Sequence, residues 1–153
     1  MRQFVTRWAT GLSFLLGLVV FSSAPAFAQD GGVRGGISVD PDQFYFGGHL
    51  ETSPLIDRLY FRPNVEVGIG DNLTLIAANM EFVYKFTRSR PWNIYAGAGP
   101  ALNIVIPDEG DSNTDAGLNI LVGVEQARGL FFEFKLGAID SPDFKFGVGY
   151  TWR

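Results

Sequence analysis

The sequence contains no cysteine and only one histidine among its 153 residues. Without thiols it can form neither disulfides nor thiolate metal sites. Basic residues are also scarce, since 12 Lys and Arg stand against 16 Asp and Glu, which gives a formal net charge of −4. A net negative chain argues against nucleic acid as a partner, because phosphate backbones are bound by basic surfaces.

Long apolar runs are confined to the amino terminus. Arg2 and Arg7 form a positive region, residues 11–21 are apolar, and Ala26-Phe27-Ala28 has the small-residue pattern of a cleavage site. Such an arrangement is typical of a secretory signal peptide. The alternative, a transmembrane helix, is disfavoured because the run is shorter than the roughly 20 residues needed to span a bilayer.

We therefore predict a cleaved signal peptide over residues 1–28, with Ala26 and Ala28 at the cleavage site, and one mature domain over residues 29–153. The leader carries two arginines and no acidic residue, so the mature domain has a net charge of −6. No later stretch is apolar enough for a membrane helix.

Glycine and phenylalanine dominate the mature domain. The chain has 19 glycines, 14 phenylalanines and 8 prolines, a composition that favours short strands and tight turns. Clusters of turn residues separate eight candidate strands, and no long linker interrupts them. The strands are predicted at residues 32–39, 43–52, 59–69, 73–86, 92–106, 116–126, 130–139 and 143–152. The simplest topology is an up-and-down meander of hairpins.

Apolar and polar residues alternate along these strands. In residues 59–69, for example, Phe61 and Val65 alternate with Arg62 and Asn64. A soluble lipocalin-like barrel would alternate too, so the inner face must be assigned separately. The polar face is rich in glycine, which suits the narrow inside of an eight-stranded barrel. We predict an all-β, eight-stranded antiparallel up-and-down transmembrane β-barrel with its apolar face toward lipid.

The carboxy-terminal strand carries the most specific pattern. Lys145, Gly147, Tyr150 and Trp152 have the spacing polar-x-Gly-x-x-aromatic-x-aromatic. This spacing resembles the carboxy-terminal assembly signal of bacterial outer-membrane β-barrels, and the resemblance implies recognition by the barrel-assembly machinery. One departure is Arg153, which follows the terminal aromatic residue.

Over residues 31–153 the pattern resembles the small outer-membrane β-barrel proteins of the OmpA/opacity-like superfamily, the outer membrane protein beta-barrel domain. Residues 130–150 are the segment most similar to that family. The resemblance implies a fold and a location in the bacterial outer membrane, but no single activity. Members serve as structural barrels, adhesins or lipid-modifying enzymes.

The turns sort by charge into two alternate sets. Residues 40–42, 70–72, 107–115 and 140–143 are acidic, whereas the turns with Arg58, Arg88, Arg90 and Arg128 and the terminal Arg153 are basic. An even number of strands places both termini on one side, so we expect both termini and the basic set in the periplasm and the acidic set outside. Acidic loops would meet lipopolysaccharide phosphates through divalent cations; the alternative is that they only aid solubility.

Aromatic residues gather beside both sets of turns. Tyr60, Phe131, Tyr150 and Trp152 lie among those near the basic set, and Phe44, Tyr45, Phe46 and Phe144 lie near the acidic set. Two aromatic girdles at the two bilayer interfaces are expected from this placement.

Catalytic and metal candidates are few. His49 has inward parity with Tyr45 and Glu51, and hairpin geometry makes Ser38 the nearest inward hydroxyl. The family's deacylases use a His-x-Ser arrangement that His49-Leu50-Glu51 lacks, and residues 111–115 lack the glycine and glutamate of a calcium loop. We predict no catalytic, cofactor-binding or metal-binding residue, and interpret His49 as a structural residue of the lumen.

Eight charged residues have inward parity, four of each sign. They are Arg62, Glu66, Glu81, Lys85, Glu125, Glu133, Lys135 and Lys145. Balanced charges in a narrow lumen favour a self-paired polar core over an ion-selective ring. We predict a monomeric barrel with a plugged lumen and a structural or surface-interaction role among outer-membrane lipids and lipopolysaccharide. The alternatives are a narrow channel and a lipid-modifying enzyme.

Overall fold

The computed structural model describes residues 28–86 and 91–153. The predicted signal peptide, with Ala26, therefore lies outside the described residues, and only Ala28 falls within them. Within the described ranges, no helix is long and apolar enough to cross a membrane.

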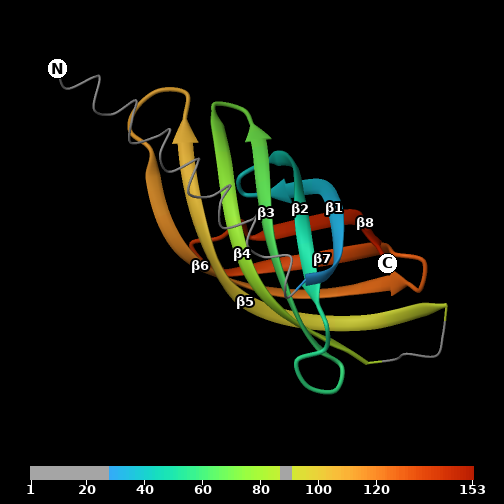
Figure 1. The fold of residues 1–153 in the computed structure, drawn as a ribbon. Helices are drawn as coiled ribbons and strands as arrows, with labels where there is room; N and C mark the ends of the chain where they lie inside the picture. Colours follow the sequence, from blue (N-terminus) through green and yellow to red (C-terminus); the bar gives the residue numbers. More distant parts are fainter. Residues whose placement is uncertain (1–27, 87–90) are drawn as a thin grey trace.

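Eight antiparallel strands follow one another around a closed barrel in chain order (Figure 1). The strands are β1 (Ala28–Val39), β2 (Gln43–Thr52), β3 (Leu59–Gly70), β4 (Leu73–Lys85), β5 (Trp92–Pro107), β6 (Asn113–Gln126), β7 (Leu130–Ile139) and β8 (Phe144–Trp152). The predicted up-and-down topology is confirmed. Closure is made by β1 and β8, which pair from Gly31 opposite Trp152 to Val39 opposite Phe144.

Two strands begin earlier than the sequence pattern predicts. β1 starts at Ala28 and β6 at Asn113, four and three residues before the predicted starts. Both extensions are polar or glycine-rich and show no alternation. They become strand because partners are available, as where Asn113 pairs with Val105 and Thr114 with Ile104 of the long β5. Pairing therefore extends the sheet beyond the amphipathic pattern.

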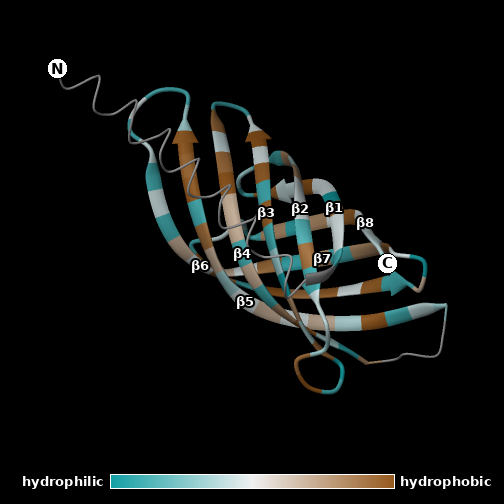
Figure 2. Ribbon diagram, in the orientation of Figure 1, coloured by the Kyte–Doolittle hydropathy of each residue, from teal (hydrophilic) through white to brown (hydrophobic). Residues whose placement is uncertain are grey.

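The outer surface of the barrel is apolar. Figure 2 shows hydrophobic and hydrophilic residues alternating along each strand. Most large hydrophobic side chains are exposed, with Phe44 at 76% and Phe46 at 58% exposure, whereas most buried side chains are polar or charged. This arrangement is the inverse of a soluble barrel and matches a lipid-facing wall around a polar lumen. The molecule is a transmembrane β-barrel.

Some aromatic residues assigned to the interfacial girdles lie inside the barrel instead. Phe131 and Tyr45 are 1% and 5% exposed and point into the lumen, and Lys85 lies over the ring of Tyr60 at 4.0 Å. The reason is strand parity, because Phe131 shares its face with the buried Glu133. Several other aromatics form outward-facing pairs, such as Tyr150 with Trp152 and Phe134 with Phe144.

The two ends of the barrel differ in charge. We define the acidic end by the turns at residues 40–42, 71–72, 108–112 and 140–143, which contain Asp and Glu but no Lys or Arg. The basic end has the other turns, including Arg58 and Arg128, together with the start of β1 and Arg153.

Candidate functional site

Among the described residues, ten buried charged side chains lie in the lumen, five acidic and five basic, and we call them the lumenal charge network. All eight residues predicted from inward parity are among them. The other two are Arg34 of β1 and Glu51 of β2. The signal for Arg34 was its parity with the inward Ser38, but the surrounding glycines obscure the alternation of β1. Glu51 has the same inward parity as His49 and Tyr45.

Toward the acidic end, Glu66 of β3 is the centre of a cluster of cations. Its carboxylate accepts hydrogen bonds from Lys135 at 2.9 Å, Lys145 at 2.7 Å and Arg34 at 3.4 Å. Lys135 also pairs with Glu81 of β4 at 2.6 Å. Strands β1, β3, β4, β7 and β8 are thus connected across the lumen rather than only along the sheet.

Toward the basic end, Glu51 and Glu125 share two cations. Arg62 donates two hydrogen bonds to Glu51, one of them from Nε at 2.8 Å, and a third to Glu125 at 3.3 Å. Lys85 lies 2.6 Å from Glu51 and 2.9 Å from Glu125.

Glu133 of β7 joins the two clusters. Its carboxylate lies 3.1 Å from Arg34 and 3.6 Å from Arg62, and it accepts a hydrogen bond from the Tyr95 hydroxyl at 2.8 Å. The guanidinium of Arg62 lies 4.9 Å from the centre of the Tyr95 ring, and that of Arg34 lies 5.4 Å from the Phe131 ring. The network is therefore continuous and is packed between aromatic faces.

The ion pairs of this network do not follow the ladder between β3 and β4. Arg62 stands directly opposite Glu81 in the ladder. Nevertheless, among the described residues neither Arg62 nor Lys85 forms an ion pair with Glu66 or Glu81, and all four pair with other strands. Arg62 pairs instead with Glu51 of the adjacent strand β2, whereas Glu66 and Glu81 pair with Lys135 of β7 across the lumen. The β3–β4 ladder therefore does not determine the pairs.

Amide side chains complete the middle of the lumen. Asn64 donates to Glu81 at 2.9 Å, Asn79 donates to Asn64 at 2.7 Å, and Asn119 donates to Asn79 at 2.8 Å. This chain of amides links β3, β4 and β6 and satisfies buried polar groups that would otherwise be costly.

His49 lies in the lumen near the basic end. Its Nε2 is 2.9 Å from the Thr151 hydroxyl, and its ring stacks edge-on against Phe131 at 5.4 Å. Ser38 is not its partner, because Ser38 lies toward the acidic end and donates to the Pro41 carbonyl at 3.0 Å. The Nδ1 atom of His49 has no hydrogen-bond partner among the described residues, so no carboxylate orients the ring as in a catalytic dyad.

Arg153 closes the basic end of the lumen. Its guanidinium lies 2.9 Å from Glu125, 3.7 Å from Glu51 and 3.9 Å from Asp30. The residue that departs from the usual end of such chains thus pairs with carboxylates on β1, β2 and β6.

The residues of the predicted assembly signal lie on both faces of β8. Lys145 belongs to the lumenal charge network, and Tyr150 and Trp152 face outward. Gly147 packs against the Tyr45 hydroxyl, which would have to shift if a methyl group were added there. In the part of the chain that the structure describes, no group of three or more His, Asp and Glu side chains could hold a metal ion.

Two solved structures have a similar fold. Neisserial surface protein A (NspA) is 17% identical, with a TM-score of 0.66 over 80% of this chain and 94% of that chain. The outer membrane enzyme PagL is 14% identical, with a TM-score of 0.54 over 81% of this chain and 99% of that chain. No family model and no curated protein matches the sequence. The chain therefore has the fold of the small outer-membrane β-barrels, and this fold is shared by a surface protein and an enzyme.

Proposed function

We propose that this protein is a non-conducting barrel of the bacterial outer membrane with a structural or surface-interaction role. The observation that carries the proposal is the lumenal charge network, in which five carboxylates and five cations fill the lumen and pair with one another. A buried charge without a partner is strongly disfavoured, so opening a path for ions would require breaking several pairs at once.

Conductance in planar lipid bilayers tests the plugged lumen. The wild-type protein should give no steady single-channel current. As a matched variant, replacing Arg34 and Glu133 by Ala removes the pair at 3.1 Å that joins the two clusters, and it should raise the frequency of current steps. A steady wild-type conductance would instead favour the narrow channel.

We infer that the protein is exported through its signal peptide, is recognised at β8 by the barrel-assembly machinery, and inserts as a monomer. The apolar wall and the resemblance to the OmpA/opacity-like superfamily support this assignment. Both termini would lie in the periplasm, and the acidic end would contact lipopolysaccharide through divalent cations. Amino-terminal sequencing of membrane-extracted protein should begin at Gln29. Recovery of the intact chain with Met1 would contradict cleavage.

We propose that the protein is not an enzyme, although PagL shares the fold. His49, the one histidine of the chain, contacts Thr151 inside the lumen, away from lipid ester bonds. A lipid-modifying activity would appear as a mass change in lipid A or phospholipids between a deletion strain and its parent. Unchanged lipid masses are expected.

A further inference from the structure

The hairpin of β5 and β6 rises past β7 and β8 at the acidic end (Figure 1). β6 begins at Asn113 and pairs with β5 from Asn113 opposite Val105 onward. Its pairing with β7 begins only at Leu118 opposite Ile139, because β7 ends there. Residues 113–117 of β6 therefore have a neighbouring strand on one side only.

No other backbone hydrogen bond closes this edge in the part of the chain that the structure describes. The turn between β7 and β8 reaches only as far as Gly117, where an added methyl group would overlap the Ser141 hydroxyl. Thr114 and Ala116, above this contact, are exposed. Alternate residues of an antiparallel strand direct their N–H and C=O groups to opposite sides. The edge above Gly117 thus presents free donors and acceptors to a further strand.

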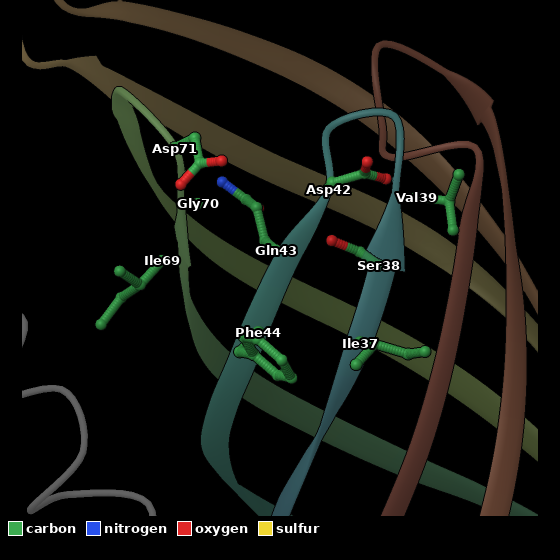
Figure 3. Close-up of a pocket in the computed structure, with 9 residues that line it drawn as sticks. All are labelled: Ile37, Ser38, Val39, Asp42, Gln43, Phe44, Ile69, Gly70 and Asp71. Carbon is green, nitrogen blue, oxygen red and sulfur yellow. The ribbon is translucent and has the colours of Figure 1, made fainter.

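Within the described ranges, the β1–β2 hairpin at the same end of the barrel has no comparable edge. Ser38 of β1 stands opposite Gln43 of β2, and Gln43 stands opposite Gly70 of β3. Figure 3 shows these three residues on adjacent strands, next to the turns. β1, β2 and β3 are thus paired up to their turns, whereas β6 is not.

The hairpin that carries the free edge is acidic. Its turn contains Asp108, Glu109 and Asp111, and Asp115 lies within the edge itself. The carboxylate of Asp115 accepts hydrogen bonds from the Asn113 amide at 2.8 and 2.9 Å. A cation beside Asp115 on an added strand would gain a cross-strand partner of opposite charge. Because Asp115 lies in β6, outside the turns that define the acidic end, this contact leaves the turn carboxylates available to divalent cations.

The two faces of the edge determine what the added strand must carry. Asp115 shares its parity with the inward Asn119, whereas Thr114 and Ala116 share theirs with the outward Leu118. The added strand therefore needs a basic residue on its inward face and small or β-branched residues on its outward face. A second copy of the edge fits less well, since antiparallel self-pairing would bring the two Asp115 carboxylates together.

We propose that the free edge of β6 binds an extended, basic segment of a partner protein at the cell surface and adds it to the barrel wall as a further strand. Main-chain hydrogen bonds to residues 113–116 hold the segment, and one of its Lys or Arg side chains lies beside Asp115. The proposal rests on the proposed function, because it requires the acidic end to face outward, and it names the partner of the surface-interaction role.

Hydrogen exchange of the folded protein in detergent micelles, followed by NMR, tests the proposal with a synthetic peptide as the probe. The peptide is acetylated, alternates threonine with valine and carries one central lysine. Its addition should slow exchange at alternate amides within residues 113–116 and leave exchange in the turn at Arg128 unchanged. A peptide with glutamate in place of lysine should bind about fivefold more weakly, because like charges on paired strands repel.

N-methylated peptides distinguish strand addition from simple charge attraction. A strand presents alternate N–H groups to opposite sides, so methyl groups on one alternate set should abolish binding. Methyl groups on the other set should be tolerated. Equal binding of the two methylated peptides would show that charge alone holds the segment, and it would overturn the proposal.

Matched variants locate the contact. Asp115→Asn should remove the preference for lysine over glutamate. Asp111→Asn removes the same charge from the adjacent turn and should retain that preference. Loss of the preference in both variants, or no slowing of exchange within residues 113–116 of the wild type, would contradict the assignment of the site.

Failure of this proposal can be distinguished from failure of the proposed function. Membrane insertion and conductance are measured separately on the same preparation, and a conducting barrel that binds the peptide would count against the proposed function alone. An inserted, non-conducting barrel whose residues 113–116 do not respond to the peptide would count against the edge alone. Dimerisation of the wild type through residues 113–116 would assign the edge to a second copy and overturn the proposal.

Discussion

At the scale of single residues, the charges of the lumen differ in the number of ion-pair partners that each one has. Each of the five buried carboxylates lies at ion-pair distance from at least two cations. The cations, in contrast, differ in how many carboxylates they pair with. Lys135 pairs with Glu66, Glu81 and Glu133. Lys145 pairs with Glu66 alone among the described residues. Loss of different carboxylates should therefore have unequal effects on stability.

The substitution Glu66→Gln should be more destabilising than Glu81→Gln. Without the Glu66 carboxylate, Lys145 keeps no ion-pair partner in the described chain, and stranding a buried charge costs about 3–5 kcal/mol. After Glu81→Gln, Lys135 retains Glu66 and Glu133. Urea titrations in lipid vesicles give both unfolding free energies, with Asp111→Asn as the exposed control. Equal losses for all three variants would contradict a paired lumen.

The substitution Val65→Arg tests the outer wall. Val65 lies near the middle of β3 and pairs with Gly48 and Ala78 on the lipid-facing side. An arginine at the membrane midplane should destabilise the barrel by about 2–4 kcal/mol, whereas near an interface the cost is about 0–1 kcal/mol. Ile139→Arg at the end of β7 is the matched control. The same vesicle titrations measure both, and identical losses would place Val65 away from the midplane.

At the scale of strands, the ladder between β4 and β5 is interrupted near its middle. Pro63 of β3 and Pro100 of β5 flank Met80 of β4, and prolines lack the N–H that a ladder uses. Pairing between β4 and β5 runs to Asn79 opposite Ala101 and resumes at Phe82 opposite Ala98, so Met80 and Pro100 are not paired. Gly99, the neighbour of Pro100, lies close to the backbone of Met80, because an added methyl group would overlap the Met80 carbonyl.

The substitution Gly99→Ala should therefore weaken the barrel at the β4–β5 pair, by roughly 1–3 kcal/mol as for other overpacked sites. The same change at Gly48 is the control, because its added methyl group would meet no atom closer than 3.6 Å. Gly48→Ala should be neutral or slightly stabilising, since it restricts the unfolded chain. Hydrogen exchange of the β4 and β5 amides should quicken only in the Gly99 variant, and slow exchange in both would rule out the overlap.

Strand positions were predictable where the alternation was strong, as in β3, β4 and β6, because one face must meet lipid and the other the lumen. The glycine-rich β1 gave no such contrast, so Arg34 and the early start of the strand were missed. Phe131 was placed by its nearness to a turn rather than by its parity with Glu133. Pairing across the lumen could not be predicted, because it depends on barrel width and not on neighbours in the ladder.

At the scale of the whole molecule, the separation of charge between the two ends predicts its orientation. An epitope inserted between Glu109 and Asp111 of the acidic end should be reached by antibody on intact cells. The same epitope after Arg128 at the basic end should be reached only after permeabilisation, because an even strand number keeps that end with the termini. The reverse labelling pattern would invert the assignment.

The barrel topology itself was predictable from the sequence, since eight amphipathic segments with short connections leave few ways to satisfy every backbone group in lipid. The same requirement for backbone hydrogen bonds predicts that the barrel closes at a seam where β1 pairs with β8.

The seam has a genetic consequence. β1 and β8 form a full ladder, and Arg153, which follows β8, pairs with Asp30 of β1 and Glu51 of β2. A polypeptide that stops even one strand early leaves two unpaired edges, which a bilayer does not tolerate. A nonsense codon that removes β8 should therefore be as damaging as one before β1, and the barrel cannot close until β8 has been synthesised.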